Sequence, residues 1–324
     1  GYWPESLLTP PSEEAMEYDL RFMKECGFNM LRKHVTVEPR RFYYLCDKMG
    51  LLVWQDMPSG GGFVGRSSPD WNRPPESARQ FQRELKRMIE TRFNHPSIIM
   101  WVPFNEGWGQ FRTEQIVSFI KRLDPYRLIN NASGWADRNC GHVIDFHAYP
   151  GPAAPEPEPG RAAVLGEFGG LGLNIQGHMW EESGWGYDLF DTKESLLIRY
   201  EKLFADLLPL IEDPGLSAAV YTQISDIETE NNGLLTYDRK IEKIDPEAAA
   251  KAAAGLLPPQ LHSISSLFID TMSVVLQAPL KNPEIRYTLD GSAPGPTSPL
   301  YTAPVLIWEN STLKTVAVYE NGIS

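Results

Sequence analysis

The sequence predicts an α/β fold, a (β/α)8 TIM barrel whose first strand is missing, followed by a small C-terminal β-sandwich domain. Helical and strand-like segments alternate from the start of the chain to about residue 245. Polar residues follow almost every predicted strand, and in a barrel all such residues converge on one mouth. No Gly-x-Gly-x-x-Gly follows a strand, which counts against the doubly wound nucleotide-binding sheet.

The elements follow from apolar periodicity and from capping residues. Ser12 begins a helix that ends at Gly27, because serine caps a helix N-terminus and glycine adopts the left-handed conformation that ends one. Further helices are expected over 39–49, 76–93, 113–123 and 193–211, and strands over 29–34, 51–54, 98–105, 128–131, 143–147, 163–167 and 216–223. Seven strands are therefore visible, and we expect the first of the eight to precede Gly1.

The character of the sequence changes after residue 245. An alanine-rich stretch and Leu257-Pro258-Pro259 separate the barrel from a strand-like tail. In the tail, apolar and polar residues alternate over 272–276, 285–289, 305–308 and 313–319, between turns rich in glycine and proline. We therefore expect a barrel domain over 1–245, a linker over 246–260 and a β-sandwich over 261–324.

Composition excludes several classes of protein. The 324 residues carry a net charge of -12, so no basic face is available to neutralise the phosphates of a nucleic acid. No run of eighteen apolar residues is present, so we expect no membrane span. The cysteines Cys26, Cys46 and Cys140 are widely spaced, which favours buried thiols over a disulfide framework or a metal site.

Two predicted strands end in a glutamate. The apolar run 98–104 leads to Asn105-Glu106, and the run 162–165 leads through Gly166 to Glu167. A buried parallel strand is continuously hydrophobic, and the polar residues at its carboxyl end lie where barrels carry their chemistry. The sequence therefore predicts a paired-carboxylate active site.

The same segments carry a family resemblance. Residues 28–34 (FNMLRKH), 44–54 (YLCDKMGLLVW) and 95–101 (HPSIIMW), followed by Asn105-Glu106, resemble the catalytic barrel of glycoside hydrolase family 2, which includes β-galactosidases, β-glucuronidases and β-mannosidases. Residues 285–301 resemble the small β module at the C-terminus of chitobiase-like enzymes. The resemblance implies a sugar-binding jelly-roll domain and an immunoglobulin-like domain before the barrel in the full-length protein. Relatives with the C-terminal module are often exported, which suggests a periplasmic or secreted location, but the residues leave the compartment open.

The resemblance implies a retaining exo-β-glycosidase, β-galactosidase-like, that acts on a carbohydrate without cofactor or metal. Glu106 maps onto the acid/base and Glu167 onto the nucleophile, which would form a covalent glycosyl-enzyme. Retention requires the two carboxyl groups to lie about 5 to 5.5 Å apart. Environment must then keep Glu106 protonated and Glu167 ionised.

Further residues are expected to bind the substrate. Asn105 would hydrogen-bond the sugar 2-hydroxyl, and Arg32 would hold the nucleophile ionised through its opposite charge. Gln223 stands near the position where many family members place a tryptophan under the sugar. The remaining candidates are His34, His147 and Trp108, for which structural roles in the rim or the core stay open.

Two other classes of function remain open. A metal-dependent barrel hydrolase could use His34, His147, Glu167 and Asp56, although the sequence lacks the closely spaced ligands typical of such sites. A catalytically silent carbohydrate-binding protein is the other alternative. Chelator-insensitive hydrolysis of an aryl glycoside would exclude the first, and turnover of any kind would exclude the second.

Overall fold

The computed structural model describes residues 3–263, 265–280, 283–320 and 322–324. The chain divides into two compact units, Gly1–Pro246 and Glu247–Ser324. Each unit is described by itself below.

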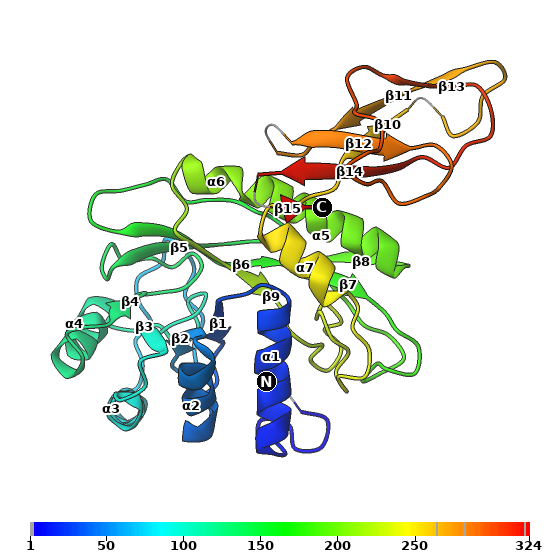
Figure 1. The fold of residues 1–324 in the computed structure, drawn as a ribbon. Coiled ribbons are helices and arrows are strands. Elements are labelled where there is room, and N and C mark those ends of the chain that lie inside the picture. The colour runs from blue at the N-terminus through cyan, green and yellow to red at the C-terminus, as the bar shows by residue number, and fades with distance from the viewer. Residues whose placement is uncertain (1–2, 264, 281–282, 321) are drawn as a thin grey trace. The chain divides into compact units, whose positions relative to one another are not determined.

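Parallel strands form the centre of the first unit (Figure 1). One sheet has the order β1-β2-β3-β4 and the other the order β5-β6-β9. The strands are β1 (Met30–Lys33), β2 (Leu52–Asp56), β3 (Ile98–Val102), β4 (Leu128–Ile129), β5 (Val143–Ala148), β6 (Ala162–Gly169) and β9 (Ala218–Thr222). The helices are α1 (Glu13–Glu25), α2 (Arg40–Met49), α3 (Pro75–Arg92), α4 (Thr113–Leu123), α5 (Lys193–Leu207) and α6 (Pro209–Glu212).

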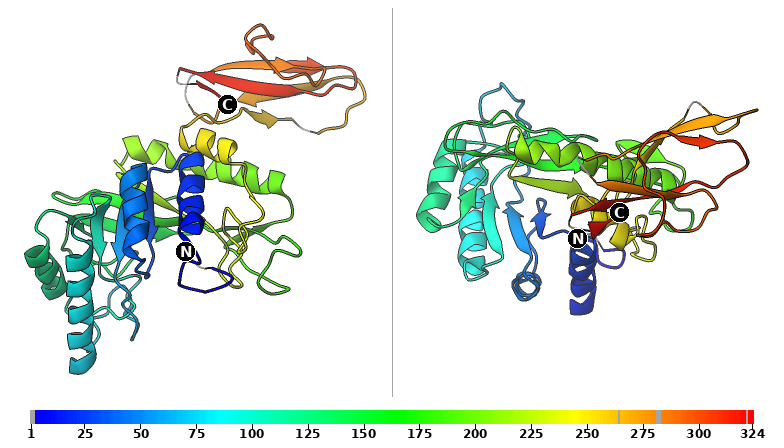
Figure 2. Two further views of the ribbon diagram at one scale, coloured as in Figure 1. Left: turned by 60° about the horizontal axis from the view of Figure 1, so that its bottom comes forward. Right: turned by 45° about the horizontal axis from the view of Figure 1, so that its top comes forward.

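The strands bury both faces, as the central strands of a barrel do. On one face, Trp54, Met100 and Val102 pack against Val143 and Val164, so a single apolar interior joins the two sheets. On the other face lies the larger core that the strands share with α1 to α4. In Figure 1, α2, α3 and α4 lie along one side of β1 to β4, and β5, β6 and β9 lie on the other. Figure 2 shows α1 beside α2.

Three details differ from the sequence prediction. The strand expected over 98–105 ends at Val102, because Pro103 has no N–H to continue the ladder. The single helix expected over 193–211 is wrong: α5 ends at Leu207 and α6 begins at Pro209. Leu208 between them keeps helical angles (φ -58°, ψ -39°), but Pro209 has no N–H to continue the hydrogen-bond pattern. A short parallel pair, β7 (Leu171–Leu173) and β8 (Asp188–Phe190), was not expected, since three-residue strands carry no usable period.

The second unit begins with a helix and continues as a β-sandwich. Helix α7 (Pro246–Ala253) lies within the residues expected to be a linker. Two antiparallel sheets follow, with the orders β10-β11-β13 and β12-β14-β15. Their strands are β10 (Gln260–His262), β11 (Met272–Gln277), β12 (Glu284–Thr288), β13 (Val305–Ile307), β14 (Lys314–Tyr319) and β15 (Gly322–Ile323). The core contains Val274, Leu276, Val305 and Ile307 from the first sheet and Ile285 from the second.

The cysteines are free thiols. Cys26 and Cys46 are buried and Cys140 is half-buried. Burial raises the pKa of Cys26 and of Cys46 to about 12, so both stay protonated and inert. None of the helices in the described ranges combines the length and the apolar character that a membrane span needs.

Candidate active site

Arg32, near the end of β1, connects the carboxyl ends of four strands. Its guanidinium donates two hydrogen bonds to Asp56, Nε to Oδ1 at 3.0 Å and Nη2 to Oδ2 at 2.7 Å. Nη1 donates to Glu167 Oε1 at 2.9 Å, and Nη2 donates to Asn105 Oδ1 at 2.9 Å. The Arg32 side chain is only 2% exposed. The buried Arg32 therefore holds in place the Glu167 carboxylate and the Asn105 amide, two groups that the sequence analysis predicts for the active site.

Glu167, on β6, is held as a carboxylate. Its Oε1 accepts from Arg32, and its Oε2 accepts from the Tyr149 hydroxyl at 2.6 Å. Burial alone would raise the pKa of Glu167, but His147, Arg32 and His34 lower it, and with the Tyr149 hydrogen bond they bring it to about 2. Glu167 is thus ionised over the whole physiological pH range.

Glu106 lies in the loop after β3. Its backbone has a left-handed φ of 51°, and its N–H donates to the Ser133 carbonyl at 2.8 Å. The Glu106 carboxyl reaches across to β5, where Oε1 lies 2.8 Å from His147 Nδ1. One oxygen of Glu106, one oxygen of Glu167 and a ring nitrogen of His147 lie within 4.8 Å of one another. The two glutamates therefore have the close spacing that retaining glycosidases require.

The side chains of Asp145 and Ser133 hold the ring of His147 in place. Asp145 accepts from the Gly166 N–H at 2.6 Å, from Asn130 Nδ2 at 2.6 Å and from the Ser133 hydroxyl at 2.5 Å. Ser133 Oγ also lies 2.8 Å from His147 Nε2, and Arg32 Nη1 lies 3.4 Å from the same nitrogen. With Nε2 held on this side, Nδ1 of His147 faces Glu106.

Tyr149 is a site residue that the sequence analysis missed. Besides Glu167, its hydroxyl contacts Thr222 Oγ1 at 2.9 Å, and its ring stacks on Tyr187 with centroids 3.8 Å apart. Burial and the nearby Glu167 raise the Tyr149 pKa, so the phenol stays a donor. A signal existed: Tyr149 follows His147 by two residues, and side chains two apart along an extended chain share a face.

Asn105 and His34 lie beside the paired carboxyl groups. The Asn105 carbonyl oxygen faces Arg32, and its Nδ2 donates to none of the residues that the structure describes. His34 is half-exposed, with Nε2 3.8 Å from Glu167 Oε1. Desolvation and the Arg32 charge lower the His34 pKa, which favours the neutral ring. Both side chains are thus available to an incoming ligand.

Trp108 and Gln223 lie in different settings. The Trp108 indole is 49% exposed and packs against Phe63, with ring centroids 5.2 Å apart. Gln223 donates from Nε2 to Asn232 Oδ1 at 2.7 Å, and no contact of Gln223 with either glutamate is present in the described parts of the chain. The structure thus brings Trp108, but not Gln223, next to a cavity of about 750 Å3 whose lining includes Asn105, Glu106 and His34.

A metal site at this position would compete with contacts already made. Within the described ranges, Glu106, His147 and Glu167 form the one group of His, Cys or acidic side chains spaced to hold an ion. Both oxygens of Glu167 already accept hydrogen bonds, and the Arg32 cation lies 2.9 Å from one of them. Asp56, the fourth ligand considered from the sequence, is paired with Arg32. These contacts therefore suit an ionised carboxylate paired with arginine better than a divalent cation.

Residues 11–151 match the family described as "Glycosyl hydrolases family 2, TIM barrel domain". This segment is therefore similar to the barrel domain of family 2 glycosyl hydrolases. The family 2 match includes Arg32, Asn105, Glu106 and His147 and ends before Glu167, so the position of Glu167 rests on the geometry above. Residues 274–324 match a second family, described as Fn3 associated.

Relatives and solved structures agree with the family. A β-galactosidase of Aeromonas hydrophila is 31% identical over 190 residues, 52% of this chain and 18% of that protein. A β-galactosidase of Leuconostoc mesenteroides is 32% identical over 132 residues, 41% of this chain and 13% of that protein. The chain thus spans less than a fifth of the length of these curated relatives.

Solved structures resemble this chain in fold. An FMN-binding β-glucuronidase from Facaelibacterium prausnitzii L2-6 aligns with 97% of this chain and 52% of its own, with a TM-score of 0.60 and 17% identity. A GH2 β-galacturonidase from Eisenbergiella tayi aligns with 76% of this chain and 48% of its own, with a TM-score of 0.54 and 19% identity. These likenesses confirm the TIM barrel class.

Proposed function

We propose that residues 1–245 form the catalytic domain of a retaining exo-β-glycosidase that acts by double displacement. The observation that carries the proposal is the approach of Glu106 and Glu167 to within 4.8 Å, with the two carboxyl groups in different environments. Glu167 has a pKa lowered to about 2, and Glu106 lies 2.8 Å from Nδ1 of His147. The family 2 match and the β-galactosidase relatives support the substrate class.

In the first step, a Glu167 oxygen attacks the anomeric carbon while Glu106 gives its proton to the glycosidic oxygen. The bond between that carbon and that oxygen breaks, the leaving alcohol departs, and the sugar stays on Glu167 as an ester. Arg32 and Tyr149 hold the attacking carboxylate in place, so little rearrangement is needed when the bond forms.

In the second step, Glu106 acts as a base. It takes a proton from a water molecule, the water oxygen attacks the anomeric carbon, and Glu167 leaves as a carboxylate stabilised again by Arg32. Each step inverts the anomeric centre, so the product keeps the configuration of the substrate. The separation of the carboxyl groups leaves no room for the water that a single inverting displacement would need.

His147 acts here as a positioning residue. Its side chain has no exposed surface and lies against both glutamates, with Nδ1 2.8 Å from Glu106 and 3.4 Å from Glu167. We therefore assign it to the control of the Glu106 proton in place of the sugar contact expected from the sequence. Asn105 remains the candidate for the sugar 2-hydroxyl, because its Nδ2 stays available while Arg32 holds its oxygen.

A panel of 4-nitrophenyl β-glycosides tests the proposal. Galactoside, glucuronide, galacturonide, glucoside and mannoside are assayed with the full chain, with and without a chelator. We expect hydrolysis of at least one β-glycoside, unchanged by the chelator, with a product that NMR identifies as the β-anomer before mutarotation. An α-anomer as first product would overturn the retaining mechanism. Activity lost to the chelator would favour a metal hydrolase, and no turnover would favour a silent binding protein.

A further inference from the structure

Two neighbouring cavities lie on the acid/base side of the candidate site. The first, the Glu106 cavity of about 750 Å3, has Glu106, Trp108 and Arg73 in its lining. The second, the arginine cavity of about 550 Å3, has Arg40, Arg87 and Arg92 in its lining. Pro58 lines both, so the two cavities adjoin each other.

The Glu106 cavity includes the leaving-group side of the bond to be cleaved, beside Asn105 and His34, which also line it. A general acid must lie beside the leaving oxygen, and a nucleophile must lie on the opposite face of the anomeric carbon. Glu106 lines this cavity and Glu167 does not. The half-exposed Trp108 offers an aromatic face in the same cavity, as sugar-binding sites commonly do.

Arg73 brings a positive charge into the Glu106 cavity. Its Nε donates to Ser77 Oγ at 2.9 Å, and its Nη1 donates to the carbonyls of Ser59 at 2.9 Å and Gly109 at 3.2 Å. Nη2 makes no hydrogen bond, and the guanidinium no ion pair, with any residue of the described ranges. Partial burial lowers the Arg73 pKa, and the charge of Glu84 opposes this effect without cancelling it. Its guanidinium is thus held in place with one donor edge unused.

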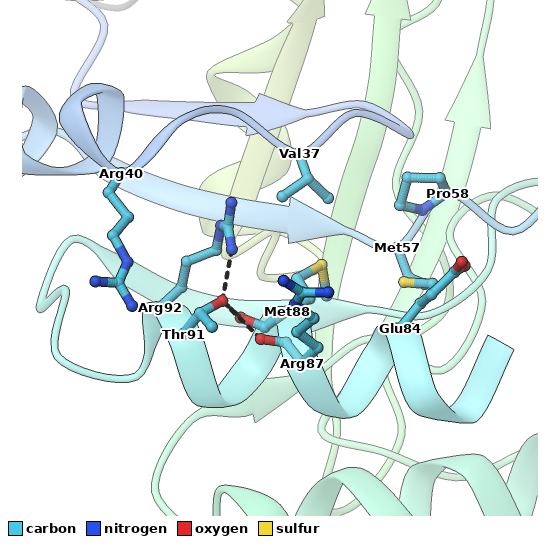
Figure 3. Close-up of a pocket in the computed structure, with 9 residues that line it drawn as sticks. All are labelled: Val37, Arg40, Met57, Pro58, Glu84, Arg87, Met88, Thr91 and Arg92. Atoms are coloured by element: carbon cyan, nitrogen blue, oxygen red, sulfur yellow. Dashed lines mark hydrogen bonds between the residues drawn. The ribbon is translucent and has the colours of Figure 1, made fainter. Parts of the chain in front are cut away.

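The arginine cavity adds to this charge. Figure 3 shows Arg40 coming from the start of α2 and Arg87 and Arg92 from α3, with Pro58 at the end away from Arg40. Arg92 is tied to the Glu38 carbonyl and to Thr91, but the guanidinium groups of Arg40 and Arg87 are exposed and bond to no residue that the structure describes. Glu84 is the single acidic lining residue. In a chain with a net charge of -12, three arginines against one glutamate form a locally positive surface.

We propose that the leaving group of this enzyme is an anionic saccharide carrying carboxylate or sulfate groups. Arg73 would meet the negative group of the departing sugar, and Arg40 and Arg87 would meet the next anionic unit along the chain. This inference rests on the proposed glycosidase activity. Guanidinium groups recognise carboxylates and sulfates through paired, charge-assisted hydrogen bonds, and the unused Nη2 of Arg73 supplies such a donor beside the general acid.

Three matched disaccharides test the proposal. All carry the terminal sugar that the aryl glycoside panel selects, linked to a neutral sugar, to the corresponding uronate or to its sulfate ester. We expect kcat/KM for at least one anionic substrate to exceed the neutral one by about tenfold, as one charge-assisted hydrogen bond supplies. The preference should shrink as salt is added. The anionic substrate with the higher kcat/KM shows whether the enzyme recognises a carboxylate or a sulfate group.

The variant Arg73→Gln should remove the preference and leave the neutral disaccharide within about threefold of wild type. Arg83→Gln is the matched control: it removes an exposed arginine of α3 that lines neither cavity. If Arg73→Gln also loses the neutral substrate, the loop held by Ser59 and Gly109 has moved, and a second variant decides. The double variant Arg40→Gln, Arg87→Gln should then weaken a trisaccharide with two anionic units several-fold and leave the neutral disaccharide unchanged.

Distinct results overturn the two proposals. Equal kcat/KM for neutral, uronate and sulfated substrates in the wild type, or a preference that survives both the Arg73 variant and the double variant, would disprove anionic recognition. The neutral aryl glycoside would still be hydrolysed in that case. Loss of all turnover, the aryl glycosides included, would instead overturn the glycosidase proposal.

Discussion

His147 Nδ1 lies 2.8 Å from Glu106 Oε1 and 3.4 Å from Glu167 Oε2. One fully buried imidazole therefore contacts both glutamates, one from the loop after β3 and one from β6. The Ser133 and Asp145 hydrogen bonds hold the imidazole with Nδ1 toward the glutamates. In the proposed mechanism, the contrast between an acid and an ionised nucleophile therefore depends on this buried network.

The two glutamates should respond differently to azide. Glu106→Ala should keep the first step for aryl glycosides with good leaving groups, because these need no proton. Azide should then accelerate turnover and yield a β-glycosyl azide, since it attacks the glycosyl-enzyme from the face that water would use. Glu167→Gln should lose at least about a thousandfold in kcat, because the attacking carboxylate is gone. Chromatography and NMR of the products provide the measurement.

Glu90→Gln is a control for this experiment, because it removes an acidic side chain that is exposed on α3, where it pairs with Lys86. Its kinetics should match those of the wild type. Equal losses in Glu106→Ala and Glu167→Gln, with no azide product from the alanine variant, would contradict the assignment of acid and nucleophile.

Tyr149→Phe should shift the acid limb of the pH profile of kcat/KM to higher pH. The Tyr149 hydroxyl donates to Glu167 Oε2 at 2.6 Å and helps to lower the Glu167 pKa. Without this hydrogen bond the Glu167 pKa rises, and the carboxylate becomes protonated at a higher pH. We also expect kcat/KM at neutral pH to fall about tenfold or more, as for a hydrogen bond to a charged group.

Tyr187→Phe is the matched control, because it keeps the ring that stacks on Tyr149 at 3.8 Å and removes only a neighbouring hydroxyl. An acid limb that moves equally in both variants would show that the hydroxyl of Tyr149 has no special effect on Glu167.

The stability of the first unit should fall as the pH drops from about 5 toward 2. The folded-state pKa of Glu167 is about 2, below its ordinary value of 4.5. A group whose pKa is lowered by folding stabilises the protein fully above its unfolded pKa, and this contribution is lost as the pH falls through the folded pKa. Urea unfolding followed at several pH values measures the effect. Glu167→Gln should show a smaller loss between pH 5 and pH 3, and an unchanged slope in this variant would contradict the low pKa.

Gly166→Ala should destabilise the first unit by about 2 kcal/mol or more and reduce activity, because overpacking forces the backbone to shift. A Cβ at Gly166 would lie 2.3 Å from Asp145 Oδ2 and 2.7 Å from Ser133 Oγ. Moving β6 away from Asp145 would displace the adjacent Glu167. Gly65→Ala is the control, since its Cβ would meet only the Ser68 hydroxyl, at 3.2 Å. Thermal unfolding and kcat/KM are the two measurements, and equal unfolding midpoints for both variants would disprove the steric argument.

Much of the barrel could be predicted because its signals are local. The alternation of helix and strand, the cap at Ser12 and the polar residues after each strand depend on neighbours in the sequence. The paired glutamates are selected by the same rule, since parallel strands bring their carboxyl ends to one edge. The break at Leu208 shows the limit of such local signals. The apolar period runs on past this residue, but the helix is interrupted where Pro209 follows.

The site's hydrogen bonds could not be read from the sequence. Arg32 and Asp56 are 24 residues apart, and Arg32 and Glu167 are 135 apart, so no periodic pattern relates them. The sequence does not distinguish Tyr149 from the other aromatic residues, and only the structure places its hydroxyl 2.6 Å from Glu167. Gln223 followed a strand as the other candidates did, yet its amide bonds to Asn232.

The sequence by itself determined the α/β class, the order of most elements and the two glutamates, because strand-end position and apolar periodicity are properties of the chain. Only the tertiary structure decided which partners surround each glutamate. Glu167 contacts Arg32 and Tyr149, while Glu106 contacts Nδ1 of His147. In the proposed mechanism, two identical carboxyl groups differ in function because of the charges and donors within a few ångströms, and long-range folding alone brings those groups together.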